Sequence, residues 1–337
     1  MFEKGNASFN FSMDDAVQMM NARDLVPKKI LQLIEKDERI AYLNSDAMPE
    51  GSNVRAVSER LPDRVTDVGI AEMNLVGISA GMALAGKIPF ANAFGPFLSL
   101  RAVDQIHTDV AYQNLPVRLI ATHGGTTPGG GPTHYAICDF AIMNSIPNMT
   151  VIAPSDANQS VKVIEASVDY PGPIFMRIAR GDEPQVYPDG ADYDFEIGKS
   201  IRVREGVDAT IIGAGVGVWL GLQASLRLEQ EGFSVRVIDM HTIKPLDREA
   251  VVAAARETGH IVTVEDHNIE GGLGTLVAAA IAEAGVAVKL KKLGVPDEFA
   301  LLGNPDSIYP EYGYDVEGVT NTTRALISPD APAGAQG

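Results

Sequence analysis

The sequence predicts an α/β protein with two domains, each an open, mostly parallel sheet flanked by helices. The chain has 337 residues, which is long for one ordinary hydrophobic core. Hydrophobic residues make up 45%, aromatic residues only 6%, and there are 33 glycines, a balance that favours α/β layers over a β sandwich. Short β-branched runs alternate with helical patterns along the chain, as in βαβ units.

The first half of the chain carries the clearest alternation of strands and helices. Strands are predicted at 39–43, 88–93, 117–121, 150–153 and 174–178. Helices are predicted at 24–36, 73–86, 99–112 and 156–169. The last of these helices follows Ser155 and Asp156, either of which is a good N-cap.

A turn-rich stretch, 180–190, then interrupts the pattern and marks a domain boundary. After it, strands are predicted at 209–213, 234–238 and 260–264, and helices near 215–231, 247–257 and 272–284. We therefore expect a flexible leader at 1–15, a first domain at 16–185, a linker at 186–200, a second domain at 201–328 and a flexible tail at 329–337.

Charge and cysteine content restrict the partners and the location of the protein. The net charge of −17 makes nucleic acid and anionic membrane surfaces poor partners. Cys138 is the only cysteine, so an intramolecular disulfide is excluded and a reducing cytoplasm is expected. No apolar run reaches the length of a membrane span, and the N-terminus, with Asp14 and Asp15, lacks a signal-peptide layout. These features predict a soluble cytoplasmic protein.

The second half contains a glycine-rich turn that is similar to a dinucleotide-binding fingerprint. Gly213, Gly215 and Gly217 follow a predicted strand and open a predicted helix. The third glycine of the fingerprint belongs at position 218, which is Val, and the spacing to Asp239 is longer than usual. We interpret this turn as structural.

Glu72 is the most informative residue. It follows a short apolar stretch and opens a predicted helix of small and apolar residues. The residues of this helix predicted to face a core are Leu75, Ile78, Met82 and Ala85. A carboxylate at the edge of a core has lost hydration, which is unfavourable unless it is protonated or paired. Glu72 is therefore either an acid that stabilises its own helix dipole or part of a functional site.

Two histidines frame a loop that follows the predicted strand 117–121. Five glycines separate His123 from His134. A single loop histidine is more often a surface residue than a catalytic one. However, two histidines at the carboxyl end of a parallel strand favour a ligand-binding loop.

Two further pairs flank the same sheet edge. Phe94 and Phe97 lie in a turn after the strand 88–93, where they are either core residues or a stacking platform for a flat ring. Arg23 precedes the first helix and Arg180 follows the last strand of the first domain. Single arginines are normally solvated, but this pair brackets one sheet edge, as a clamp for an anionic group such as a phosphate would.

With these motifs in one order, the chain resembles the C-terminal half of a transketolase, over roughly residues 20 to 325. The motifs that carry the resemblance are Gly-Ile-Ala-Glu72, Phe94-x-x-Phe97, Arg101-Ala-Val-Asp-Gln, Gly-Pro-Thr-His134, Ile-Pro-Asn-Met-Thr-Val-Ile-Ala-Pro-Ser-Asp156, Thr242-Ile-Lys-Pro-Leu-Asp247 and Val262-Thr-Val-Glu-Asp-His-Asn-Ile-Glu-Gly-Gly-Leu-Gly274. Together they are specific for thiamine-diphosphate enzymes and less specific for one member.

The resemblance implies a pyrimidine-binding domain followed by the transketolase C-terminal domain. In such enzymes thiamine diphosphate lies between the pyrimidine-binding domain and a diphosphate-binding domain. The latter holds Mg²⁺ or Ca²⁺ through a Gly-Asp-Gly motif, which this chain does not contain. The resemblance therefore implies no metal site on this chain and an N-terminal partner subunit that carries the missing domain. It also implies homodimerisation within an α₂β₂ assembly and no activity of the chain alone.

The resemblance also assigns roles to residues that contact the cofactor. Glu72 is expected to hydrogen-bond N1′ of the aminopyrimidine ring. Phe94 and Phe97 match the aromatic residues that pack on that ring. Asp46 occupies the place of an acidic residue near the cofactor.

For the substrate, the resemblance implies that His123 and His134 contact the reacting carbonyl and hydroxyl groups. Arg23 and Arg180 are expected to bind a substrate phosphate. The implied activity is transfer of a two-carbon ketol unit between sugar or sugar-phosphate substrates, a reaction of carbohydrate metabolism.

Three departures from the family pattern affect the choice of substrate and enzyme. Gly130 stands where transketolases usually have the Asp that selects acceptors with a 2-hydroxyl group. The loop between the histidines is one residue shorter, and Glu72 is followed by Met-Asn instead of His. Deoxyxylulose-phosphate synthases share the sequence that ends in Glu72 but usually carry Asp in place of His123. Ketol transfer is therefore favoured over the synthase activity.

Three alternatives stay open from the sequence. The first is a synthase-like carboligase of the deoxyxylulose-phosphate type. The second is the β subunit of a 2-oxoacid dehydrogenase or acyloin-forming enzyme. The third is a regulatory or assembly subunit without catalytic activity. The paired arginines disfavour the second alternative. The joint presence of Glu72, both phenylalanines and both histidines disfavours the third.

Overall fold

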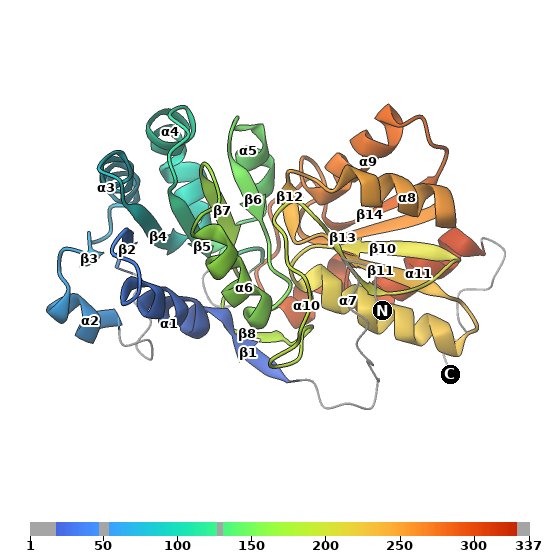
Figure 1. The fold of residues 1–337 in the computed structure, drawn as a ribbon. Coiled ribbons are helices and arrows are strands. Elements are labelled where there is room, and N and C mark those ends of the chain that lie inside the picture. Colours follow the sequence, from blue (N-terminus) through green and yellow to red (C-terminus); the bar gives the residue numbers. More distant parts are fainter. Residues whose placement is uncertain (1–17, 47–53, 127–130, 329–337) are drawn as a thin grey trace.

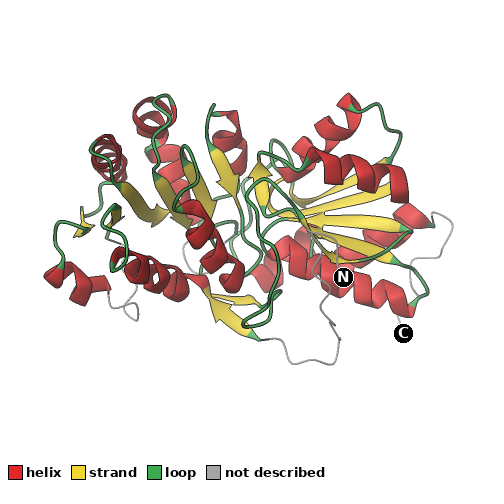
Figure 2. Ribbon diagram, in the orientation of Figure 1, coloured by secondary structure: helices red, strands yellow, loops and turns green. Residues whose placement is uncertain are grey.

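The computed structural model describes residues 18–46, 54–126 and 131–328. The predicted leader, the predicted tail and Gly130 lie outside the described residues. Two α/β units lie side by side, each with helices on both faces of a sheet (Figures 1 and 2). The predicted fold class is therefore confirmed.

The first unit alternates short strands and helices from the start of the described chain to residue 184. Its strands are β1 (Met19–Asn21), β2 (Ile40–Asn44), β3 (Val65–Asp67), β4 (Ile88–Phe94), β5 (Arg118–Thr122), β6 (Thr150–Ile152), β7 (Ile174–Arg177) and β8 (Asp182–Pro184). Its helices are α1 (Ala22–Ile34), α2 (Val54–Arg60), α3 (Glu72–Leu84), η2 (Phe97–Arg101), α4 (Val103–Gln105), η3 (Ile106–Ala111), η4 (Pro132–His134), α5 (Asp139–Ser145) and α6 (Ala157–Ser167).

The sheet of the first unit has seven strands in the order β12-β6-β7-β5-β4-β2-β3. All pairs are parallel except β12 with β6, so the carboxyl ends of β2, β4, β5 and β7 share one edge. Most of these strands are buried throughout, which is why they are continuous apolar runs in the sequence. The crevice at the carboxyl edge of such a sheet is the usual place for a ligand.

The second unit contains a five-stranded sheet of its own, flanked by helices. Its strands are β9 (Ile201–Arg204), β10 (Ala209–Gly213), β11 (Val235–Asp239), β12 (Thr242–Lys244), β13 (His260–Asn268) and β14 (Lys289–Val295). Its helices are α7 (Val216–Gln230), α8 (Arg248–Thr258), α9 (Leu273–Glu283), α10 (Pro305–Tyr312) and α11 (Val316–Ile327). Its own sheet has the order β14-β13-β10-β11-β9, in which β9 is antiparallel.

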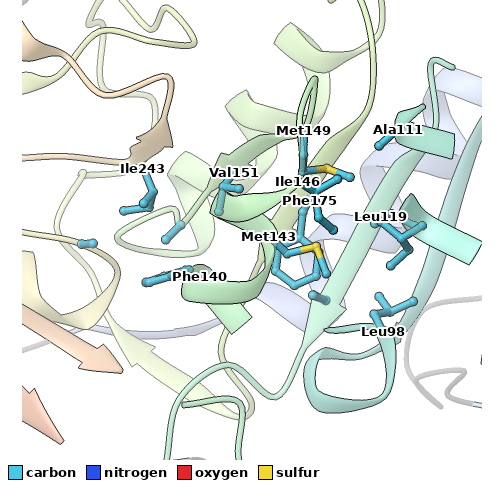
Figure 3. Close-up of a cluster of buried hydrophobic side chains, with 14 of the residues drawn as sticks. Leu98, Ala111, Leu119, Phe140, Met143, Ile146, Met149, Val151, Phe175 and Ile243 are labelled. Carbon is cyan, nitrogen blue, oxygen red and sulfur yellow. The ribbon is translucent and has the colours of Figure 1, made fainter. Parts of the chain in front are cut away.

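The two units are joined by shared structure rather than by a linker alone. Strand β12, which follows β11 in the sequence, pairs with β6 at the edge of the first sheet. Its Ile243 extends the apolar cluster that contains Phe140, Val151 and Phe175 of the first unit (Figure 3). This cluster continues into the second unit through residues such as Ile212, so one core supports both sheets.

Helix α3 differs from its predicted orientation. Leu75 is buried and Met82 packs partly buried against the core, as predicted, but Ile78 is 37% exposed and Ala85 lies after the helix end. The buried face consists of Leu75, Val76, Ser79, Ala80 and Ala83 in addition to Glu72. The helix is apolar on both faces, so hydrophobic periodicity does not identify the one that meets the sheet.

Of two other local predictions, one is confirmed and the other differs from the structure. Asp156 is the N-cap of α6 and accepts a hydrogen bond from the N–H of Gln159 at 2.7 Å, as predicted. The helix predicted at 99–112 consists of two π-helical segments, η2 and η3, joined by the short α4. Its first segment carries Phe97 and Arg101, which both enter the site described below.

Candidate active site

The carboxyl edge of the first sheet brings most of the candidate residues together. Phe94 ends β4 and pairs with Thr122 at the end of β5, so His123 follows directly beside Phe94. Arg180 comes three residues after the end of β7, the next strand. The parallel order of the sheet therefore aligns residues that are far apart in the sequence.

Glu72 is the first residue of α3 and is only 3% exposed. Its Oε2 accepts a hydrogen bond from Nη1 of Arg101 at 2.7 Å. The guanidinium of Arg101 also lies 4.2 Å from the ring centre of Phe97, a cation–π geometry. Among the described residues, Oε1 of Glu72 has no hydrogen-bond partner. One carboxylate oxygen is thus fixed by Arg101, and the other is available.

Two phenylalanines and two histidines form a ring cluster beside this pair. The ring centres of Phe94 and Phe97 are 5.6 Å apart. His123 lies 3.9 Å from Phe94, and His134 lies 5.2 Å from Phe97. The two imidazole centres are 6.3 Å apart. The structure therefore brings the loop histidines and the aromatic pair together as one surface.

His123 has an unusual backbone conformation and a strongly lowered pKa. Its φ of +64° lies in the left-handed region, which costs about 1 kcal/mol or more for a residue with a side chain. Burial lowers the pKa of His123 to about 3, with further lowering by the charges of Arg23, Arg180 and His134. His123 is therefore neutral at physiological pH and acts as a hydrogen-bonding group rather than a cation.

Each histidine uses Nδ1 for a contact with the threonine that precedes it. Nδ1 of His123 is 3.0 Å from the hydroxyl of Thr122, and Nδ1 of His134 is 2.9 Å from that of Thr133. In the described chain neither Nε2 has a protein partner. These contacts fix both rings and leave Nε2 of each for an external group.

Arg23 and Arg180 are close enough to influence each other. The pKa of Arg23 is lowered, first by partial burial and then by the charge of Arg180. Both charges also act on His123. The two arginines therefore lie near each other and near His123, as the sequence predicts.

Asp46 lies at the same edge but has no direct contact with the ring cluster. It follows β2 with φ +47°, is exposed, and its N–H donates to Oδ1 of Asp67 at 3.2 Å. Asp67 also accepts a hydrogen bond from Asn44 at 3.1 Å. These contacts describe a turn held at the end of β2, and they leave the predicted cofactor contact of Asp46 an expectation.

The second unit holds the start of the histidine loop. The carboxylate of Asp266, on β13, accepts hydrogen bonds from the N–H and hydroxyl of Thr126 and from the hydroxyls of Tyr309 and Tyr314. Gly125 has φ +71°, and a Cβ placed on it would lie 1.9 Å from Oδ2 of Asp266. Glycine is therefore required at this close approach.

Sequence reasoning missed two of these residues. Arg101 was part of a recognised motif, but its pairing with Glu72 spans 29 positions and has no local signal. Its position four residues after Phe97 was the only hint, since such residues lie on one helix face. Asp266 lies 140 positions from Thr126, and no pattern in the sequence links them.

The glycine-rich turn of the second unit is structural, as predicted. A Cβ on Gly217 would lie 2.2 Å from the carbonyl oxygen of Val264, so α7 packs directly on β13. Asp239 is fully buried and accepts hydrogen bonds from Tyr187 and Gln159, each at 2.6 Å. It is therefore committed to protein groups rather than positioned for a ribose.

No helix in the described part of the chain is long and apolar enough to cross a membrane. In the same part, no group of three or more His, Cys, Asp or Glu side chains is placed to hold a metal ion.

Comparisons with known proteins agree with this architecture. Residues 18–185 match the model of the transketolase pyrimidine-binding domain, and residues 198–319 match that of the transketolase C-terminal domain. One of the subunits of the apulose-4-phosphate transketolase of Phocaeicola vulgatus is 38% identical over 314 residues, covering 93% of this chain and 99% of that protein.

Two other similar proteins differ in length. The 1-deoxy-D-xylulose-5-phosphate synthase of Syntrophotalea carbinolica is 38% identical over 299 residues, which are 88% of this chain but only 47% of that protein. A solved structure described as a split gene transketolase, an inactive β4 tetramer, superposes with a TM-score of 0.84 at 33% identity. The superposition covers 92% of this chain and 99% of that chain.

The fold defines a two-domain α/β protein whose candidate site lies at the carboxyl edge of its first sheet. The chain belongs to the transketolase family. The resemblance seen in the sequence is therefore confirmed.

Proposed function

We propose that this chain is the pyrimidine-domain subunit of a two-component transketolase, which transfers a two-carbon ketol unit between sugar or sugar-phosphate substrates. The observation that carries the proposal is that buried Glu72, whose Oε1 has no hydrogen-bond partner among the described residues, pairs with Arg101, and that Arg101 lies over Phe97 of the ring cluster. The split relative from Phocaeicola vulgatus has nearly the same length as the aligned region, which supports a two-component enzyme.

The residues present fit the pyrimidine half of thiamine diphosphate. Glu72 offers a carboxylate oxygen without a partner among the described residues, and Phe94 and Phe97 offer aromatic rings linked to Glu72 through Arg101. When bound, thiamine diphosphate supplies the nucleophilic carbon that accepts and releases the two-carbon unit. Glu72 would share a proton with N1′ of the ring at Oε1, while Arg101 holds Oε2 and fixes the orientation of the carboxylate.

The two histidines would act on the substrate. Each has Nδ1 engaged by a threonine hydroxyl, so Nε2 is the atom that meets a substrate carbonyl or hydroxyl. Because burial keeps His123 neutral, it can accept or donate a hydrogen bond without adding charge. Arg23 and Arg180 would bind a substrate phosphate, and Asp46 would lie near the cofactor.

The proposal includes an N-terminal partner subunit that carries the diphosphate-binding domain and the Mg²⁺. The chain spans about half of the deoxyxylulose-phosphate synthase that it matches, and it lacks a Gly-Asp-Gly motif. Large apolar side chains close to Glu72 and Arg101 in the sequence are exposed: Ile70 is 75% exposed, Met73 49% and Leu100 55%. Such a face is expected where another chain covers the site. We further propose an α₂β₂ assembly in a reducing cytoplasm, consistent with the single cysteine.

The test is reconstitution. The chain is mixed with the subunit encoded by a neighbouring reading frame, thiamine diphosphate and Mg²⁺, and ketol transfer from a ketose phosphate to an aldose phosphate is followed. We expect activity only in the complete mixture and a fall of at least about a hundredfold for Glu72→Gln. Glu38→Gln, an exposed change away from the site, serves as the matched control. Normal turnover of Glu72→Gln would overturn the assigned role.

A second candidate function is carboligation of the deoxyxylulose-phosphate type, because the identity to such a synthase is also 38%. The same mixture distinguishes the two when it is given pyruvate and glyceraldehyde 3-phosphate. Release of CO₂ without ketose cleavage would favour the synthase, and ketose cleavage without CO₂ would favour the transketolase. Loss of CO₂ from other 2-oxoacids would instead indicate a 2-oxoacid dehydrogenase subunit.

A further inference from the structure

A cavity of about 830 Å³ lies between the two units and adjoins the candidate site, because its lining includes Arg180 and residues Gly124 and Thr126 of the histidine loop. Its walls are β8 of the first unit and the glycine-rich turn, α7 and α10 of the second. In Figure 1 these elements meet near the centre of the molecule, where β8 and α10 lie close to the start of α7. The volume is within the range of small-molecule pockets, and such pockets occur preferentially between domains.

Glu183 is the residue that makes this cavity unusual. It lies on β8 opposite Met20, lines the cavity and is 7% exposed. Within the described residues, the carboxylate of Glu183 has neither a hydrogen bond nor an ion pair. Its oxygen atoms are not completely enclosed by protein. Its remaining accessible surface therefore opens on the cavity. Burial raises the pKa of Glu183 to about 8, and the charge of Asp156 adds to this.

Arg177, whose charge acts on Glu183, does not pair with it directly. The guanidinium of Arg177 lies 3.3 Å from Oδ2 of Asp139 and donates to the carbonyl oxygens of Ala136 and Asp266. Its charge acts on Glu183 only at a distance. A buried carboxylate without a direct partner is unfavourable, and natural proteins rarely keep one without a use.

Apart from Arg180, which the proposed function uses for a substrate phosphate, the charged residues that line the cavity are mostly acidic and favour a positively charged ligand. Six lining residues are acidic and three are arginines, and the acidic ones include Asp306 and Glu317 at the rim. The N-terminus of α7 also reaches the cavity at Gly215, but the excess of negative charge opposes an anion there.

The rest of the wall is apolar and aromatic. Trp219 and Leu220 of α7 line one side, and Tyr309 of α10 lines another. An indole ring is the best aromatic partner for a cation. We propose that this cavity binds a small organic cation with an aromatic or apolar body, and that Glu183 is the residue that takes its positive charge. The proposed ligand differs from the sugar substrates of ketol transfer, although the cavity shares Arg180 with the candidate substrate site.

The chain provides its own reporter for the test, because Trp219 is its only tryptophan. The full chain is titrated with 2-phenylethylammonium and, separately, with its uncharged counterpart 2-phenylethanol, at about pH 8.5, where the larger part of Glu183 is ionised and the amine is charged. We expect a saturable change in tryptophan fluorescence with the ammonium and at least about tenfold weaker binding of the alcohol.

Glu183→Gln is expected to weaken ammonium binding about tenfold and to leave alcohol binding unchanged. Circular dichroism checks that this variant folds, and Asp306→Asn, an exposed change at the rim, gives a second test with a smaller loss of about twofold. Glu38→Gln is the control and should change nothing. Equal affinity for ammonium and alcohol, no saturable change with either, or unaltered ammonium binding by Glu183→Gln would each overturn the proposal.

Discussion

Asp266 accepts two hydrogen bonds from Thr126, one from its N–H at 3.0 Å and one from its hydroxyl at 3.0 Å. Asp266 belongs to the second unit, whereas Thr126 lies three residues after His123 in the first. The hydroxyls of Tyr309 and Tyr314 donate to the same carboxylate at 3.1 and 3.0 Å. The second unit therefore positions the histidine loop of the first, which gives it a role in the site although none of its residues joins the ring cluster.

Replacement of Asp266 tests this role. In Asp266→Asn one oxygen becomes an NH₂ group that cannot accept from Thr126 or the tyrosines. We expect a loss of about 2–3 kcal/mol of folding free energy, as for hydrogen bonds to a charged group. We also expect about a tenfold fall in turnover of the reconstituted enzyme and faster amide exchange at 123–126. Asp63→Asn, an exposed change, is the control. A loss of stability without faster exchange in the loop would contradict a positioning role.

Arg101 is expected to affect cofactor binding more than folding. Its side chain is 45% exposed, so its loss changes little of the core, but Oε2 of Glu72 loses its only partner among the described residues. For Arg101→Met we expect about tenfold weaker apparent affinity for thiamine diphosphate in the reconstituted enzyme. The measurement is activity as a function of cofactor concentration, with Arg55→Met as the exposed control. Unchanged cofactor affinity would show that Glu72 does not depend on Arg101.

Replacement of Arg180 is expected to weaken substrate binding and to leave the rate of the chemical step unchanged. If Arg23 and Arg180 bind a phosphate, Arg180→Ala raises KM about tenfold or more for phosphorylated substrates and leaves kcat nearly unchanged. Substrates without a phosphate should be converted as well as before. The comparison uses one aldose in its phosphorylated and free forms. An equal effect on both forms would assign Arg180 to a structural role instead.

The outward face of α3 is expected to be an interface. Gly81 lies within this helix, is exposed, and a Cβ placed on it would meet nothing within 4 Å. Gly81→Gln should therefore stabilise the isolated chain by about 0.5–1 kcal/mol, because glycine is a poor helix former. The same side chain should obstruct a partner and reduce assembly measured by analytical ultracentrifugation. A more stable chain that assembles normally would show that this face is free in the complex.

The residues predicted from sequence share one property, which is that their signal is local. Buried strands such as β5 are continuous apolar runs, and the parallel order places whatever follows them at one edge. That is why Glu72, Phe94 and His123 were identified together. The core face of α3 was predicted correctly at Leu75 and wrongly at Ile78 and Ala85, because the helix is apolar on both faces. The pairs Glu72–Arg101 and Thr126–Asp266 required the tertiary structure, since nothing local in either residue indicates its partner.

His241 is expected to make folding sensitive to acid. It is fully buried between the two units, beside Phe195 and the hydroxyl of Thr242, and burial lowers its pKa to about 3. Because its pKa when unfolded is about 6.5, the unfolded chain binds the extra proton between these values and stability falls as pH falls. From about pH 7 to about pH 5.5 this histidine alone removes about 1 kcal/mol of folding free energy.

Buried acids with raised pKa values, such as Asp239 at about 7, act in the opposite direction, so the wild type alone is not informative. We therefore compare urea unfolding of wild type and His241→Asn at both pH values and expect the variant to lose about 1 kcal/mol less. Equal losses would show that His241 becomes protonated in the folded chain.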